Sequence, residues 1–131
     1  MIAVDTNVLL RLLVGDDASQ AARARRLFDR AAAEEKTIWV SDTVLVELAW
    51  TLARAYSRDR ADIVKALRSL SSHATVVLES IAAVQDAIDA FEQGRADFAD
   101  CLLSMKAKLV GCDELATFDR GMKGLPAVRL L

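Results

Sequence analysis

The sequence predicts an α/β fold: a single domain with a mainly parallel central sheet of four to five strands and helices on both faces. Its length of 131 residues fits one domain, and an apolar fraction of 53% with 27% charged residues can supply a core. Short apolar runs alternate with longer amphipathic segments, which is typical of βαβ units. We therefore expect residues 1–131 to form one globular unit.

Five short apolar segments are expected to form the strands. The first is fully apolar and ends at Asp5, and the last follows Pro126, where an edge position suits a strand next to proline. In chain order the expected strands are residues 1–4, 37–40, 75–78, 115–118 and 127–131.

Amphipathic segments between these strands are expected to form helices. Thr6 or Asn7 is expected to cap the first helix, which begins near Val8, and Ser41 or Asp42 the third. The other helices are expected over residues 18–35, 60–70, 81–91 and 97–109, and the fifth of the six stops at Gly94 in the manner of a C-terminal glycine.

Charge and apolar patterning restrict the possible surroundings of the chain. No apolar run reaches the roughly 18 residues of a membrane span, and the N-terminus starts on a strand rather than a basic signal segment. We therefore expect a cytoplasmic protein with no membrane partner. Cys101 and Cys112 lack metal-binding spacing, so buried free thiols are expected.

The formal net charge of −2 argues weakly against a nucleic-acid partner, because proteins that bind phosphates are usually basic. Arg23, Arg26 and Arg30 nevertheless recur at helical spacing and would align along one side of a helix. A solvated helix face without a partner explains that spacing as well. The stripe alone does not decide between the two.

Two aspartates directly follow expected strands. Asp5 ends the first strand and Asp119 the fourth. In an open α/β sheet the ligand site lies beyond the carboxyl ends of the strands, so both aspartates are candidates for one site. Each also suits a turn or a helix cap, and that alternative stays open.

Glu47 stands on a helix that is apolar nearly all round, because Val46 and Trp50 widen its apolar arc. We expect such a helix to be mostly buried. A buried carboxylate costs several kcal/mol unless it is paired or bound to a metal. Glu47 is therefore expected to face a metal, or else an arginine such as Arg11 or Arg54.

Asp97 and Asp100 lie one turn apart at the start of the last helix. The free amides of a first helical turn favour carboxylates in any case, and Asp97 suits the N-cap. Asp5, Glu47, Asp100 and Asp119 would form a set of oxygen donors, which favours Mg²⁺ or Mn²⁺ over zinc. The lone His73 is expected to be solvated.

Four motifs, spread over almost the whole chain, resemble those of the PIN domain family of metal-dependent ribonucleases, and within it the VapC-type toxins of bacterial toxin–antitoxin pairs. The motifs are Val4-Asp5-Thr6-Asn7, Val46-Glu47, Asp97-Phe98-Ala99-Asp100-Cys101-Leu102 and Thr117-Phe118-Asp119. The resemblance implies a PIN-like nuclease domain over residues 1–131. No acidic position of the family pattern is altered.

The resemblance also implies the chemistry. Asp5, Asp100 and Asp119 would bind Mg²⁺ or Mn²⁺, and Glu47 would be a ligand or position the attacking water. Residues that would assist nearby are Thr6, Asn7 and Thr117, with Arg11 or Arg120 steadying a phosphate. The expected activity is hydrolysis of RNA, with an antitoxin protein as inhibitor and a homodimer as the assembly.

Other functions remain to be distinguished. A receiver-like phosphoacceptor expects paired acids near the start, and an Asp-x-Asp phosphatase expects an acid where Asn7 stands; neither pattern is met. A non-catalytic RNA- or protein-interaction module on the same fold is the most serious rival. A solitary RNA-processing nuclease is the other.

Overall fold

The computed structural model describes all 131 residues and contains the expected alternation of strands and helices. The strands are β1 (Ile2–Ala3), β2 (Ile38–Val40), β3 (Val76–Leu78), β4 (Leu115–Thr117) and β5 (Val128–Leu130). The helices are α1 (Thr6–Leu13), α2 (Ala18–Ala33), α3 (Asp42–Arg54), α4 (Arg60–Ser71), α5 (Ile81–Gln93) and α6 (Phe98–Leu109), with a 3₁₀ turn η1 (Arg120–Met122). The α/β class is confirmed.

Side-chain caps fix where most helices begin. In each case an oxygen of the capping side chain accepts a hydrogen bond from an amide in the first turn, at 2.8 to 3.2 Å. The capping residues are Asp5, Asp17, Ser41, Asp59 and Asp97. The first helix therefore starts at Thr6 with Asp5 as its cap, and the expectation of a cap at Thr6 or Asn7 was wrong.

Gly94 follows α5 as expected, for a different reason than a left-handed backbone. Its φ is −113°, which any residue adopts, but a Cβ at this position would lie 2.9 Å from the carbonyl oxygen of Ala90. Glycine is needed because the chain passes close to the end of its own helix.

All strand pairs are parallel, as the sequence predicts, but the strands divide between two sheets. One sheet has the order β1-β2-β3, with Ile2 beside Ile38 and Ile38 beside Val76. The other holds only β4 and β5, with Leu115 beside Val128. The strands are therefore parallel and five in number, as expected, but they do not form one continuous sheet.

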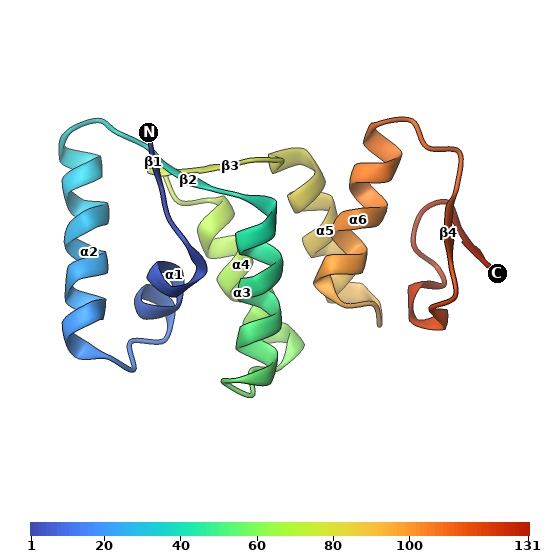
Figure 1. Cartoon of the computed structure of the whole chain (residues 1–131), viewed down its shortest axis with the longest axis horizontal. Coiled ribbons are helices and arrows are strands. Elements are labelled where there is room, and N and C mark those ends of the chain that lie inside the picture. The colour runs from blue at the N-terminus through green and yellow to red at the C-terminus, as the bar shows by residue number, and fades with distance from the viewer.

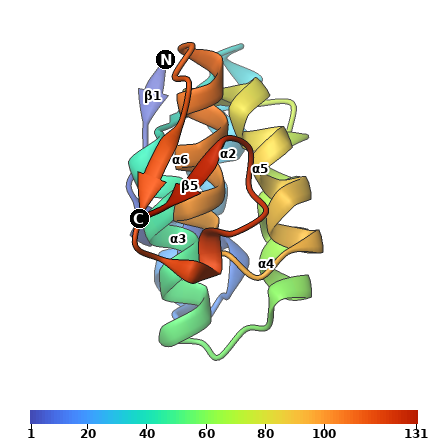
Figure 2. The same ribbon diagram turned by 90° about the vertical axis from the view of Figure 1, so that its right-hand side faces the viewer.

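The elements spread along one long axis. Figure 1 shows α2 at one end, α3 and α4 in the middle, and α6 with β4 at the other end, while β1 to β3 gather along one side of the first half. In the view down this axis, β4 and β5 lie in front of α6 and β1 is faded at the back (Figure 2). The two sheets thus occupy different parts of the molecule.

A single apolar core joins the two parts. It comprises 26 buried residues from all six α-helices and the first sheet, and Phe98 of α6 is only 2% exposed within it. Cys101 is buried as expected, but Cys112 is exposed, because it lies in the turn between α6 and β4. His73 is exposed, and no helix has the length and hydropathy that crossing a membrane requires.

Candidate functional site

Asp5 holds the start of α1 at the carboxyl end of β1. Its Oδ1 accepts the amide of Val8 at 3.2 Å, and its side chain is exposed. With Asn7, Arg11 and Arg23 it borders a cavity of about 400 Å³ between α1 and α2. Asp5 therefore has one carboxylate oxygen committed to the helix cap and the other open to a ligand.

Glu47 is exposed on α3, which corrects the expectation of a buried carboxylate. The helix buries the side that carries Leu45, Leu48 and Leu52, but its other side borders open space, so Trp50 is 61% exposed. Neither Arg11 nor Arg54 pairs with Glu47. The part of the apolar arc that Val46 and Trp50 add therefore lines a groove rather than the interior.

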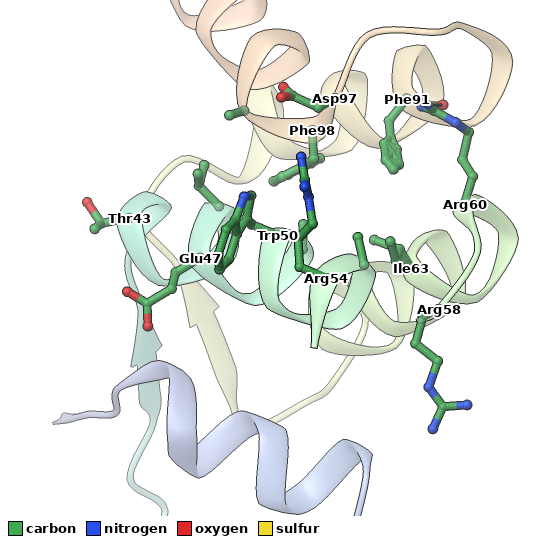
Figure 3. Close-up of a pocket in the computed structure, with 14 residues that line it drawn as sticks. Thr43, Glu47, Trp50, Arg54, Arg58, Arg60, Ile63, Phe91, Asp97 and Phe98 are labelled. Carbon is green, nitrogen blue, oxygen red and sulfur yellow. Dashed lines mark hydrogen bonds between the residues drawn. The ribbon is translucent and has the colours of Figure 1, made fainter. Parts of the chain in front are cut away.

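That groove lies between α3 and the start of α6 and has a volume of about 590 Å³. Figure 3 shows Trp50 and Arg54 on one wall and Asp97 with Phe98 on the other. The carboxylate of Glu47 lies on the rim and points away from Asp97 (Figure 3). The groove is thus mainly apolar, with acidic groups only at its edges.

Asp97 and Asp100 lie together at the start of α6. Asp97 is the N-cap, as expected, and its Oδ1 accepts the amide of Asp100 at 2.9 Å. Asp97 is exposed, whereas Asp100 is half-buried. The first turn of α6 therefore carries two adjacent carboxylates and the positive end of a helix dipole.

Asp119 is fixed by the turn that follows β4. Its amide donates to Thr117 Oγ1 at 3.0 Å, and its Oδ1 accepts the amide of Gly121 at 2.7 Å. A Cβ on Gly121 would lie 3.0 Å from that same oxygen, so glycine leaves room for the contact. Thr117 therefore helps to set the orientation of Asp119.

The electrostatics link Asp100 to its acidic neighbours. Partial burial, the charge and hydrogen bonding of Asp97, and then the charge of Asp119 raise the pKa of Asp100 from 3.8 to about 6. Burial is the largest of these causes, and the negative charge of the two other aspartates adds to it. A bound cation would offset that charge.

Replacing Asp97 with Asn is expected to lower the pKa of Asp100 part of the way from about 6 toward 3.8, because burial, the largest cause, remains. The carboxyl carbon resonance of Asp100, followed by NMR against pH in metal-free buffer, reports this value. Since the folded pKa is raised, the unfolding free energy of the wild type falls as pH rises from 3.8 to about 6. A wild-type pKa near 4 would refute the described surroundings of Asp100.

The chemistry of the acidic side chains favours a metal ion, but their placement does not bring them together around one. Asp5, Asp100 and Asp119 offer only carboxylate oxygens, which suit Mg²⁺ or Mn²⁺. No group of three or more Asp, Glu, His or Cys side chains is arranged to hold a metal ion in one chain. Asp5 and Glu47 belong to the part of the molecule that carries the first sheet, and Asp100 and Asp119 to the part that carries the second.

The arginines near these acids differ in availability. Arg11 donates to Asp16 at 2.8 Å and to Gln20 at 2.6 Å, and its contacts with Tyr56 and Asp16 raise its pKa. Its charge is already paired, which weakens its case as a phosphate ligand. Arg120 is exposed beside Asp119, and Arg23 borders the Asp5 cavity; neither makes an ion pair.

A part-buried ion pair that the sequence patterns did not reveal joins α6 to α3. Asp42 is only 9% exposed, and its Oδ2 accepts from Lys106 Nζ and, at 2.8 Å, from Ser80 Oγ. Asp42 Oδ1 has no partner. From its position after a strand, Asp42 was expected only as a possible helix cap. No sequence pattern predicts its contact with Lys106, which is far away in the chain. The pair holds α6 in place relative to α3.

Comparison with known proteins extends over nearly the whole chain. The PIN domain profile matches residues 2–127. A protein named VapC ribonuclease, from Aquifex aeolicus (strain VF5), is 28% identical over 125 residues, which cover 95% of this chain and 92% of that protein. No solved structure gives a significant match.

Proposed function

The chain belongs to the PIN domain family, and from this premise we propose that it is an endoribonuclease that depends on Mg²⁺ or Mn²⁺. One observation carries the proposal: a half-buried carboxyl group, Asp100, lies beside Asp97 and Asp119 with its pKa raised to about 6. Carboxylate oxygens are the ligands that a hard cation prefers, and a cation would offset the charge near Asp100. The similarity to a VapC ribonuclease supports RNA as the substrate.

In this proposal the acidic residues bind the metal and the residues around them support the acids or contact the RNA. A bound metal would lower the pKa of a coordinated water and offset charge on the phosphate. Asp5, Asp100 and Asp119 are the proposed ligands, and Glu47 would be a further ligand or orient the water, although no three of these side chains are arranged around one point in this structure. The Oγ1 of Thr117 accepts a hydrogen bond from the amide of Asp119 and so helps to position Asp119. Thr6 is 4% exposed and Asn7 is exposed, so we assign them to supporting Asp5 and contacting substrate, respectively.

The expected products identify the reaction. Hydrolysis by an activated water should leave a 5′-phosphate and a 3′-hydroxyl on the two fragments of a single-stranded RNA. A defined RNA pool, digested with purified protein and then ligated selectively through 5′-phosphates, tests this. Fragments with 5′-hydroxyl and cyclic 3′ ends would contradict it, since those arise from attack by the ribose hydroxyl.

An exposed arginine stripe on α2 would hold the RNA backbone. Arg23, Arg26 and Arg30 are exposed and make no ion pair, although the net charge is −2. Arg23 also borders the cavity next to Asp5. A strand bound along this stripe would therefore pass the carboxyl end of β1.

Replacing all three arginines with Ala is expected to weaken RNA binding at low salt and to flatten its salt dependence. For every phosphate that the variant no longer binds, the slope of log K against log salt should fall by about 0.7 with a single-stranded RNA. Arg68→Ala is the matched control, because Arg68 already pairs with Asp89 and Glu92. An unchanged slope in the triple variant would remove α2 from the RNA path.

We further propose that the chain is the toxin of a toxin–antitoxin pair that acts in the cytoplasm and blocks translation or growth. The apolar groove beside Trp50 could bind an antitoxin segment, with Arg54 and Arg58 to pair with its acidic residues. Induced expression should arrest growth in wild type but not in the Asp5→Asn variant. Growth without arrest, and no small DNA-binding protein encoded next to the gene, would favour a solitary RNA-processing nuclease.

A further inference from the structure

The cavity between α1 and α2 is lined mainly by polar side chains. Its volume is about 400 Å³, and Figure 1 shows α1 beside α2. Asp5 borders it with a carboxylate oxygen that the cap of α1 leaves free. A volume of several hundred Å³ is typical of a pocket for a small ligand. A nucleotide of an RNA strand that reaches Asp5 therefore has room for its base here.

Gln20 lines this cavity with a side-chain amide that is held in one orientation. Arg11 Nε lies 2.6 Å from one atom of that amide. An arginine side chain can only donate, so the atom that faces it must be the amide oxygen and not the amide nitrogen. The amide nitrogen of Gln20 has no partner within the protein. Gln20 therefore offers a ligand two N–H donors, while its acceptor is already occupied by Arg11.

Arg11 is itself held from the other side. Its Nη1 donates to Asp16 at 2.8 Å, and the hydroxyl of Tyr56 donates to the other oxygen of Asp16 at 2.9 Å. Tyr56 follows α3, so these bonds connect Arg11 to a segment outside α1 and α2. A side chain that is fixed in this way loses little conformational freedom when a ligand binds beside it. The direction of the Gln20 amide is thus set before RNA arrives.

We propose that Gln20 recognises a guanine base close to the bond that is cut, and that Arg11 is the positioning residue that fixes the Gln20 amide. The inference deepens the proposed function and rests on it for RNA as the ligand. Guanine carries two acceptors, O6 and N7, side by side. Adenine has an amino donor beside N7, cytosine presents an amino donor at the corresponding edge, and uracil presents the single acceptor O4. N–H donors without a free acceptor therefore match guanine best.

Arg23 provides a neighbouring contact for the backbone of the same nucleotide. It lies three residues after Gln20, on the same side of α2, and borders the same cavity. Its guanidinium makes no ion pair, so it can bind a phosphate while Gln20 contacts the base. Because Asp5 borders this cavity as well, the guanine preference should appear at a fixed position relative to the cleaved bond.

The base preference can be measured without cleavage. A labelled oligouridine that carries one guanosine is titrated with the protein in excess chelator. The same strand with adenosine, or with 7-deazaguanosine, which has carbon in place of N7, is titrated beside it. Wild type should bind the guanosine strand at least about fivefold more tightly than the adenosine strand, and 7-deazaguanosine should lose part of this advantage. Equal affinity for guanosine and either replacement overturns the proposal.

Two variants separate the role of Gln20 from that of Arg11. Gln20→Glu replaces the donor with an oxygen, so the preference for guanosine over adenosine should disappear. Gln85→Glu is the matched control, because Gln85 is exposed on α5 and makes no side-chain hydrogen bond, and it should bind like wild type. Gln20 is exposed too, so its replacement leaves the fold intact. An unchanged guanosine preference in Gln20→Glu overturns the proposal.

Arg11→Ala frees the oxygen of the Gln20 amide. A free glutamine amide can pair with both N6 and N7 of adenine, so adenosine should now bind about as tightly as guanosine. A loss of packing alone would weaken both strands equally and would not change their ratio. A variant that is folded by its melting curve and keeps the wild-type ratio refutes the positioning role of Arg11.

Cleavage mapping distinguishes this proposal from the proposed function. In a random single-stranded RNA pool cut in Mn²⁺, guanine should be enriched at one position relative to the cut, and Gln20→Glu should remove the enrichment. A guanosine preference in binding without any cleavage would contradict the proposed function and support the guanine site. Cleavage by wild type without any base preference would support the nuclease and overturn the guanine site.

Discussion

Asp5→Asn is expected to abolish RNA cleavage and leave the fold intact. Asn caps a helix about as well as Asp, so the bond to the amide of Val8 and the start of α1 should survive. The substitution removes a charged donor from the proposed metal site, and loss of even an outer partner of such a site costs roughly 10–100-fold. We therefore expect the initial cleavage rate in Mn²⁺ to fall by at least about 100-fold.

The matched control for this variant is Asp59→Asn. Asp59 caps α4 with the same geometry, accepting the amide of Asp62 at 2.8 Å, and is exposed like Asp5. Its replacement should leave both cleavage and melting temperature unchanged. The Asp119→Asn variant, purified in the same way and assayed at the same concentration, shows how much cleavage comes from contaminating nuclease. Full activity of Asp5→Asn above that background would show that Asp5 is not part of the site.

Arg60→Ala should be the most destabilising single change at a residue outside the apolar core. Arg60 donates three hydrogen bonds to loop carbonyls and stacks 4.1 Å from the centre of the Phe91 ring. Bonds from a charged donor contribute about 1.5–3 kcal/mol, and the carbonyl of Ala96 is left in a part-buried position. Urea unfolding should show a loss of about 3 kcal/mol.

Two neighbouring variants make this result specific. Arg58→Ala removes an exposed side chain that makes no hydrogen bond and should change stability by less than about 0.5 kcal/mol. Arg60→Lys keeps the charge but not the planar fork, so it should fall between wild type and Ala. Because Arg60 ties down the loop that precedes Asp97, the Ala variant should also shift the pKa of Asp100. Equal stability of the two Ala variants would contradict the anchoring role.

The order of elements was accessible from sequence because local signals repeat along the chain. Apolar runs bounded by capping residues located every strand and helix, and Asp97 was identified as the cap of α6, which starts at Phe98. Helix and strand ends differ by one or two residues from expectation, which is common where the last turn frays. The division into two sheets was not accessible, since strand pairing joins segments far apart in the chain.

For the candidate site too, features set by neighbouring residues in the sequence could be predicted, and features that depend on distant segments could not. The placement of Asp5 and Asp119 after strands follows from local patterns and holds in the structure. The expectation that Glu47 is buried was wrong, because Val46 and Trp50 on its helix line a groove instead of packing against another element. The raised pKa of Asp100 comes first from burial, then from Asp97 and last from Asp119, which belongs to a different element. Neither the burial of Asp100 nor its proximity to Asp119 has a local signature in the sequence.

Cleavage of a defined single-stranded RNA pool with and without metal tests the proposed function most directly. Purified wild type, kept at one concentration, is incubated with Mg²⁺, with Mn²⁺ and with excess chelator. Cleavage in either metal, its loss in chelator and its return when metal is restored are the expected results. Equal cleavage in chelator, or none with either metal in a protein shown to be folded, would contradict a metal-dependent ribonuclease.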